Sequence, residues 1–319
     1  GSIRAAAIAC GGDWQDLGGS LSDDSDGGVQ LQPLSAIDDP AERAWAAEWL
    51  AAILASEGVA VDPQAKEHIW SALGSLASAP PAERTLTGLA VLLQSQQLKQ
   101  ALAPYCLGGP WGRLLDAEVE RLGEASVQAF ETEGLVGGGS AASVLSYLFH
   151  RIDKLLTGER TIIAVDEFWK ALGDDAFRSF AQDGLKTYRK RNAMMVFATQ
   201  SPADALKSDI AHSILEQVAT QVMLPNPKGS RRDYVEGFSL TDAEYQLIRE
   251  ELSPESRKFL VKQGRDSVVV ELDLTGLDNE LAVLSGRAET TPIAVQAAAE
   301  FGPDSANWLP VFHQRRRPS

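Results

Sequence analysis

The sequences TIIAVDE at 161–167 and AMMVFATQ at 193–200 decide the fold. The first places five uncharged residues with strong β preference before two carboxylates. Such a short apolar run predicts a strand that is buried on both faces. A helical pattern separates it from the second run, which ends on Thr199-Gln200. Strand, crossover helix and strand form a βαβ unit, so we expect two parallel, neighbouring strands.

Polar side chains follow each of these strands. Ligands of parallel sheets bind beyond the carboxyl ends of the strands, so Asp166, Glu167 and Gln200 are expected to face one crevice. There Asp166 could hold the water shell of a nucleotide's Mg²⁺, Glu167 could polarise an attacking water, and Gln200 could sense the γ-phosphate. A strand whose exit happens to be acidic stays open as the alternative, because short motifs often match by chance.

The crossover helix ends in a basic cluster. Lys186, Arg189, Lys190 and Arg191 fall within six residues. Basic residues complement the dipole at a helix carboxyl terminus, which accounts for one or two of them. The remaining charge suggests an arginine finger, a guanidinium that reaches the γ-phosphate of the nucleotide bound to a neighbouring subunit.

Composition sets the limits. The 319 residues are 44% hydrophobic and 23% charged, a globular composition with a net charge of −15. This acidic balance argues against broad DNA binding by the whole surface. Cys10 and Cys106 lie far apart, which favours reduced thiols over a disulfide framework. We find no apolar run of about 20 residues that would span a membrane and no signal peptide.

Elements outside the central stretch are less regular. Pro40, preceded by Asp38 and Asp39, and Pro63 predict helix starts, and Leu89–Leu102 predicts a third helix. Gly11–Gly18 suggests a turn-rich connection. Further strands are predicted at 127–131 and 219–224, and a hairpin is predicted over 256–272. The end of the chain, Arg315-Arg316-Arg317, is a basic tail that we expect to be mobile.

A glycine loop precedes the helix expected at 141–156. Gly137-Gly138-Gly139-Ser140 could cradle a phosphate. No Lys follows these glycines, and Gly-x-x-x-x-Gly-Lys-Ser/Thr occurs nowhere in the sequence. A flexible link with Ser140 as the helix N-cap is therefore favoured.

Three motifs together carry a family resemblance. VDEFW at 165–169, LKTYRKRN at 185–192 and VFATQS at 196–201 stand in the order seen in the conjugative-transfer ATPases of type IV secretion systems, and the chain most resembles the TrbE-like branch. The resemblance implies an α/β fold: a RecA-like P-loop NTPase core, with a mostly parallel sheet flanked by helices, and an all-α insertion. It also implies ATP and Mg²⁺ as cofactors and a hexamer that works with other secretion components. The location implied is the cytoplasmic face of the bacterial inner membrane.

The same resemblance implies roles for individual residues. Asp166 and Glu167 correspond to the Walker B pair, with Asp166 holding Mg²⁺ through water and Glu167 catalytic. Gln200 corresponds to the sensor glutamine, and Arg189 and Arg191 are the arginine-finger candidates. The remaining basic candidates for contact with the nucleotide are Lys186 and Arg257.

One departure from the family pattern is the missing P-loop. We therefore expect the chain to be the carboxy-terminal part of a longer motor that powers pilus assembly and transfer of DNA or protein, and to be inactive alone. The expected divisions are 1–39, the start of the NTPase core; 40–124, the all-α insertion; 125–290, the core with Walker B and sensor strands; and 291–319, the helical end. Two alternatives stay open: a DNA-pumping motor of the coupling-protein type, and a non-enzymatic scaffold whose helical region docks partners.

Overall fold

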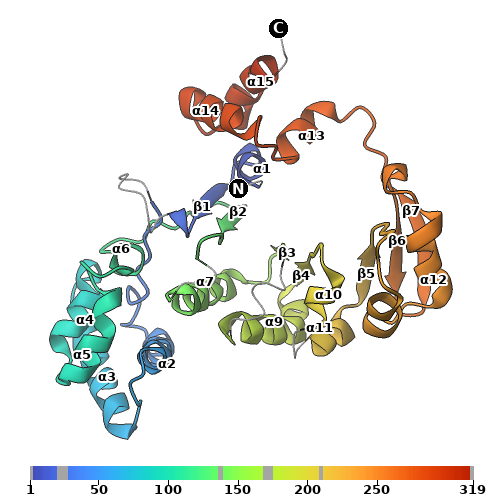
Figure 1. Cartoon of the computed structure of the whole chain (residues 1–319). Coiled ribbons are helices and arrows are strands. Elements are labelled where there is room, and N and C mark those ends of the chain that lie inside the picture. Colours follow the sequence, from blue (N-terminus) through green and yellow to red (C-terminus); the bar gives the residue numbers. More distant parts are fainter. Residues whose placement is uncertain (1–2, 20–27, 136–138, 168–174, 208–210, 317–319) are drawn as a thin grey trace. The chain divides into compact units, whose positions relative to one another are not determined.

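The computed structural model describes residues 3–19, 28–135, 139–167, 175–207 and 211–316. These residues form two compact units, whose helices and strands are labelled in Figure 1. The first unit comprises Gly1–Tyr147 and Gly276–Ser319, and the second comprises Leu148–Thr275. The second unit therefore contains both stretches that predict the βαβ segment.

Helices dominate the middle of the first unit, coloured blue to teal in Figure 1. The helix predicted to begin at Pro40 is confirmed. Asp39 and Asp62 each accept a hydrogen bond from the first turn of the helix that follows, and a proline occupies the first helical position in both. This combination fixes a helix start because the cap satisfies an N–H that has no partner within the helix. The elements are α2 (Pro40–Ser56), α3 (Pro63–Leu76), η2 (Pro81–Glu83), α4 (Leu86–Leu92), α5 (Gln96–Leu102), η3 (Ala103–Tyr105) and α6 (Gly112–Leu115).

The third predicted helix, Leu89–Leu102, is wrong as a single element. Its residues belong to two helices, α4 and α5, with Leu93 in an extended conformation between them. The Ser95 side chain accepts a hydrogen bond from the backbone N–H of Leu98 and so begins α5. A serine favours such a cap over a helix interior. Leu93 itself is buried, so the break allows an apolar side chain to enter the core.

Two short strands of the first unit pair in parallel, β1 (Asp13–Asp16) with β2 (Gln128–Glu131). Strand β2 agrees with the predicted strand at 127–131. Strand β1 falls within the segment that we expected to be a turn-rich connection, so that prediction is wrong there. Its four side chains are all half-buried and give no apolar–polar alternation for a sequence pattern to detect.

The ends of the chain pack together within the first unit. Helix α1 (Arg4–Ala9) contacts α13 (Asp278–Leu284), α14 (Thr291–Phe301) and α15 (Ser305–Arg315). Trp308 and Phe312 are fully buried in their shared core. Arg315 ends α15 and forms an ion pair with Glu300 at 2.6 Å, and Arg316 donates to Asn279 at 2.8 Å. These contacts join the two arginines to the packed helices, while residue 317 of the expected mobile tail lies outside the described part.

The second unit contains the predicted βαβ segment. Strands β3 (Thr161–Val165) and β4 (Ala193–Phe197) are parallel, in register from Thr161↔Ala193 to Val165↔Phe197. The chain passes between them through α9 (Asp175–Thr187) and the 3₁₀ turn η4 (Tyr188–Arg191). Helices α7 (Ala141–Leu155), α10 (Pro202–Ala205) and α11 (Ala211–Gln217) precede and follow this segment. The predicted parallel α/β arrangement is thus confirmed.

The described residues of this unit cover one face of the β3–β4 pair. Ile163, Val165, Met195 and Phe197 pack on a core formed with α7, α9 and α11. The alternate residues point the other way, and Ile162 is 67% exposed. The expectation of a strand buried on both faces is therefore not met here, because these helices gather on one side of the pair.

An antiparallel sheet completes the second unit. Strand β5 (Thr220–Met223) pairs with β6 (Lys258–Gln263), which forms the predicted hairpin with β7 (Asp266–Glu271). Between β5 and β6 the chain forms short helical turns. Glu244, in one of these turns, makes an ion pair at 2.7 Å with Lys262 of β6, and both side chains are largely buried. Burial opposes charge on Glu244, but hydrogen bonds from Lys262 and Thr241 outweigh it and hold the pKa of Glu244 at about 2. The turns are η5 (Arg232–Gly237), α12 (Asp242–Gln246), η6 (Leu247–Glu251) and η7 (Pro254–Ser256).

Candidate functional site

The carboxyl ends of β3 and β4 lie side by side, because the two strands are parallel and in register. They form one edge of the strand pair, which we call the carboxyl edge. Val165 lies opposite Phe197, and the ladder continues with a hydrogen bond from the Ala198 N–H to the Val165 carbonyl at 3.0 Å. Asp166 and Glu167 follow β3 directly, and Gln200 follows β4 by three residues. The three sequence-predicted polar residues therefore share one edge, where ligands of parallel sheets bind.

Asp166 and Gln200 also belong to the same exposed face. Exposed residues alternate along the first strand and its exit, and the alternation along the second strand ends on Gln200. Successive residues of a strand point to opposite faces, so the Asp166 carboxylate and the Gln200 amide extend from the face that bears Ile162 and Met194. Both side chains are solvent-accessible and could contact a ligand on that face.

Glu167 has an unusual backbone. Its φ is +48°, in the left-handed region that side chains other than glycine's rarely occupy. The turn is supported by a hydrogen bond from the Glu167 N–H to Asp166 Oδ1 at 3.0 Å. Non-glycine residues in this region cost of order 1–3 kcal/mol and are often found at functional sites. The half-buried Glu167 carboxylate is thus carried on a tight, strained turn beside Asp166.

A capped turn holds Gln200 between β4 and α10. Thr199 Oγ1 accepts from the Ser201 N–H at 3.0 Å. The Ser201 hydroxyl donates to Asp204 at 2.6 Å and accepts from the Asp204 N–H, which begins α10. These bonds fix the backbone around Gln200, so the position from which its side chain extends is defined.

The basic cluster lies at the opposite end of the strand pair, where β3 and β4 begin. Lys186 and Arg189 precede β4, so they lie at its amino-terminal end, as the crossover helix requires. A five-residue strand is about 16 Å long, so these side chains are separated from Asp166 by the length of β3. Within one chain the structure does not bring the basic cluster and the acidic pair together.

The two arginine-finger candidates differ in their surroundings. Arg189 is exposed. Arg191 donates to the Asp153 carboxylate at 2.5 Å and to the Leu156 carbonyl at 2.9 Å, at the carboxyl end of α7. The neighbouring Asn192 has a φ of +60° and donates to the Gly158 carbonyl at 3.1 Å. Sequence reasoning did not single out Asp153 or Asn192, although an Asn between a helix and a strand is a typical left-handed cap.

Arg257 belongs to the antiparallel sheet and lies immediately before β6. Its φ is +56°, and its carbonyl accepts a hydrogen bond from the Leu272 N–H at 3.0 Å. Because Met223 pairs with Leu260, Arg257 lies beyond the carboxyl end of β5. Its side chain is exposed.

The donor set fits a magnesium ion that keeps most of its own ligands. Among the described residues, no group of three or more His, Cys, Asp or Glu side chains could hold a metal by itself. Mg²⁺ is commonly bound by one or two carboxylates, with water and substrate phosphates as its other ligands. The exposed Asp166 carboxylate suits that role and leaves room for waters. The glycine loop cannot be compared in the same way, because residues 136–138 lie outside the described part.

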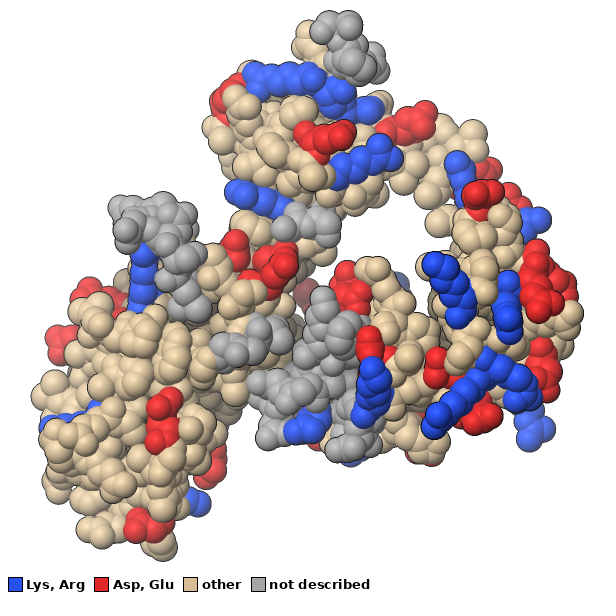
Figure 2. Space-filling model, in the orientation of Figure 1, with Lys and Arg blue, Asp and Glu red and all other residues tan. Residues whose placement is uncertain are grey.

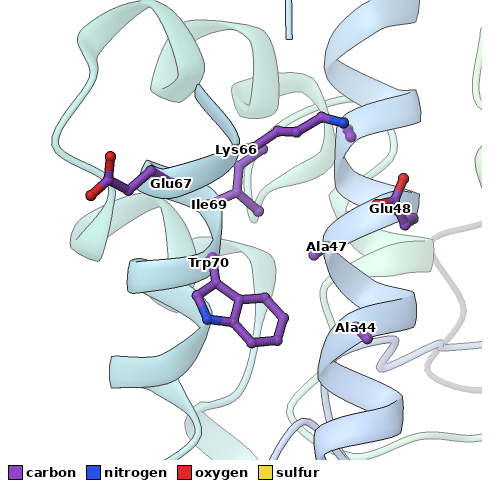
Figure 3. A pocket seen from close by; sticks show the side chains of 8 residues that line it. Ala44, Ala47, Glu48, Lys66, Glu67, Ile69 and Trp70 are labelled. Atoms are coloured by element: carbon purple, nitrogen blue, oxygen red, sulfur yellow. The ribbon is translucent and has the colours of Figure 1, made fainter. Parts of the chain in front are cut away.

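Surface pockets occur elsewhere. One of about 390 Å³ lies between α2 and α3, with Trp70 facing the small side chains of Ala44 and Ala47 (Figure 3). A second, of about 540 Å³, lies between α10, α11 and η5. The sequence-predicted site residues line neither of these two pockets. On the face drawn in Figure 2, basic and acidic side chains of the described residues are interspersed.

These features define an α/β protein with parallel strand pairs flanked by helices and a polar carboxyl edge. No family model matches the chain. The type IV secretion system protein virB4 of Bartonella quintana is 44% identical over 273 residues, which cover 84% of this chain and 35% of that protein. The type IV secretion system protein PtlC of Bordetella pertussis is 45% identical over 172 residues, 54% of this chain and 21% of that protein.

A solved structure of VirB4 from Thermoanaerobacter pseudethanolicus shares the fold. It superposes with a TM-score of 0.58 at 15% sequence identity and covers 86% of this chain and 80% of that one. The chain belongs to the VirB4/PtlC family of type IV secretion system proteins, and it spans about a third of the length of the Bartonella relative. No helix among the described residues is long and apolar enough to cross a membrane.

Proposed function

We propose that this chain is the carboxy-terminal motor region of a type IV secretion ATPase, which couples ATP hydrolysis to pilus assembly and to transfer of DNA or protein. The observation that carries the proposal is the placement of Asp166, Glu167 and Gln200 at one edge of a parallel strand pair. Catalysis of phosphoryl transfer depends mainly on positioning and charge stabilisation, which such an edge can supply.

Each polar residue has a separate role in this proposal. The Asp166 carboxylate binds water ligands of Mg²⁺, which when present neutralises charge on the phosphates. The Glu167 carboxylate accepts a proton from, or orients, the attacking water. The Gln200 amide hydrogen-bonds the γ-phosphate and reports whether it is present. Arg257, beyond the end of β5, is a further candidate for a phosphate contact.

The basic cluster acts on a neighbouring subunit. Because Lys186 and Arg189 lie a strand length from Asp166, they serve a site in the next protomer of an oligomer, for which a hexamer is the proposed state. Arg189 is the preferred finger, since it is exposed while Arg191 is bonded to α7. The assembled protein works at the cytoplasmic face of the inner membrane with other secretion components.

The test is Glu167→Gln in the full-length protein. Removing the Glu167 carboxylate should leave ATP affinity close to wild type and lower turnover by about 100-fold or more, because general acid–base groups contribute ~10²–10⁴-fold. Glu159→Gln is the matched control, since Glu159 is an exposed glutamate before the opposite end of β3. Equilibrium binding of ATP and steady-state hydrolysis are measured for both. Wild-type turnover in Glu167→Gln would remove Glu167 from the mechanism.

A further inference from the structure

Arg191 is bonded to the carboxyl end of α7 by three of its nitrogens. Nη1 donates to the Asp153 carboxylate at 2.5 Å, Nη2 to the Leu156 carbonyl at 2.9 Å and the Asp153 carbonyl at 2.5 Å, and Nε to the Leu156 carbonyl at 3.2 Å. Carbonyls at a helix carboxyl end lack partners within the helix, and a cation there also meets the negative end of the dipole. The planar guanidinium is the side chain able to satisfy this set at once.

Asn192 fixes the other side of the same turn. Its side chain donates to the Gly158 carbonyl at 3.1 Å, and its own carbonyl accepts from the Thr161 N–H at 3.2 Å, the first residue of β3. Its N–H donates to the Arg189 carbonyl at 3.3 Å. The backbone of Arg189 is therefore tied to the loop between α7 and β3.

Tyr188, the first residue of this turn, packs its ring into the core of the unit. Its ring is 5% exposed and meets Phe180 edge-on, with ring centroids 5.7 Å apart. Burial, and then the nearby Asp153 carboxylate, raise the pKa of the Tyr188 hydroxyl, so it stays neutral. Arg189 is therefore exposed, but it follows the buried Tyr188 and lies two residues before Arg191, which is hydrogen-bonded to α7.

We propose that Arg191, Asp153 and Asn192 form a clamp that positions Arg189 for its contact with the neighbouring subunit. The inference rests on the proposed function. It makes Arg191 and Asp153 positioning residues and leaves Arg189 as the catalytic arginine. Such a device matters because a displacement of about 1 Å in a catalytic group can cost ~100-fold in rate.

The experiment uses the full-length protein with Asp153→Asn and Arg191→Lys. Asparagine removes the charge of the ion pair, and lysine keeps the charge but loses the forked donors. Both variants should lower kcat by about 10–100-fold, the range expected from misplacing a catalytic group, with KM for ATP within about twofold of wild type. Arg160→Lys is the matched control, since Arg160 is exposed in the loop before β3, and it should keep wild-type kcat.

Mixed oligomers provide a readout that a folding defect would not reproduce. Asp153→Asn subunits mixed with Glu167→Gln subunits should recover activity above the sum of the two, because an intact Glu167 then meets an intact Arg189 across a boundary. Asp153→Asn mixed with Arg189→Ala should recover nothing, because both lesions affect the same side. Recovery in the second mixture, or none in the first with mixed assembly shown, overturns the clamp.

The outcomes also separate the clamp from the function beneath it. If Glu167→Gln and Arg189→Ala both keep wild-type kcat, the proposed function is wrong and the clamp falls with it. If those two lose activity while Asp153→Asn and Arg191→Lys keep it, only the clamp is wrong. Thermal unfolding checks each variant: if Asp153→Asn does not fold, Arg191→Lys decides, and if neither folds the clamp is a folding element and the inference is overturned.

Discussion

Glu167 combines a proposed chemical role with a costly backbone. The left-handed conformation brings Cβ close to the following carbonyl oxygen, at a cost of roughly 1–2 kcal/mol for an ordinary residue. Glycine has no Cβ and adopts this conformation freely. A glutamate at φ +48° therefore lowers local stability relative to glycine, which is consistent with the role proposed for its side chain.

This conflict predicts the relative stability of two variants of the 319-residue chain. Glu167→Gly and Glu167→Ala both remove the carboxylate and its contacts, but only glycine relieves the strained backbone. Glu167→Gly should be more stable than Glu167→Ala by about 1 kcal/mol, less the greater freedom of glycine in the unfolded chain. Urea unfolding of the two proteins measures the difference. Equal stability, or a more stable alanine variant, would show that the turn is not strained.

At the scale of single residues, sequence order predicted some placements and not others. Asp166, Glu167 and Gln200 were placed at one edge because strand ends can be read from local apolar runs. The bonds of Arg191 could not be read in this way, since Asp153 lies 38 residues earlier and its position depends on how α7 packs. A charged residue in a cluster has several available partners, and only the fold selects among them.

Helix α9 packs against β4 through a glycine. A Cβ added at Gly184 would lie 2.7 Å from the Met195 sulfur and 2.8 Å from the Tyr188 ring. Those distances are shorter than van der Waals contact, so the missing side chain allows the helix to approach the strand closely. Gly74, within α3, offers a contrast, because a Cβ there would meet nothing within 4 Å.

The two helices therefore predict opposite effects of one substitution. Gly74→Ala should stabilise α3 by about 0.5–1 kcal/mol, the gain in helix propensity. Gly184→Ala should destabilise α9 by about 1–3 kcal/mol, because overpacking outweighs the same gain. Hydrogen exchange of the amides in each helix measures both changes locally. Increased protection of α9 in Gly184→Ala would contradict the packing described for this helix.

Elements with strong local signals were predicted well. The βαβ segment, the β6–β7 hairpin and the helix starts at Pro40 and Pro63 follow from apolar runs, turn residues and caps. Strand β1 was missed because it depends on pairing with β2 more than a hundred positions away, Asp13 opposite Gln128. The division between α4 and α5 was missed because Ser95 caps a helix only when Leu93 leaves the helical path for the core.

At the scale of the whole molecule, the net charge of the chain affects whether it can bind a nucleotide. A net charge of −15 repels polyanions at long range, so a bound nucleotide needs local compensation. P-loop proteins supply it with backbone N–H groups and a lysine around the phosphates. The candidate edge has two carboxylates and an amide, and the basic cluster lies at the opposite end of the strand pair. Within one copy of this chain, Arg257 is the one described basic residue that we propose for a phosphate contact, and a single guanidinium offsets only part of the charge of ATP.

We therefore predict that the 319-residue chain binds ATP weakly and does not hydrolyse it. One Asp166 carboxylate is a poor anchor for Mg²⁺ without phosphate ligands held in place, so the Kd for ATP with Mg²⁺ should be weaker than about 1 mM, roughly −4 kcal/mol. Titration calorimetry measures this, with the full-length protein as the positive control. Asp166→Asn in the 319-residue chain tests the same point, since it should leave the weak signal unchanged. Micromolar binding that Asp166→Asn abolishes would show that this edge binds nucleotide without a P-loop.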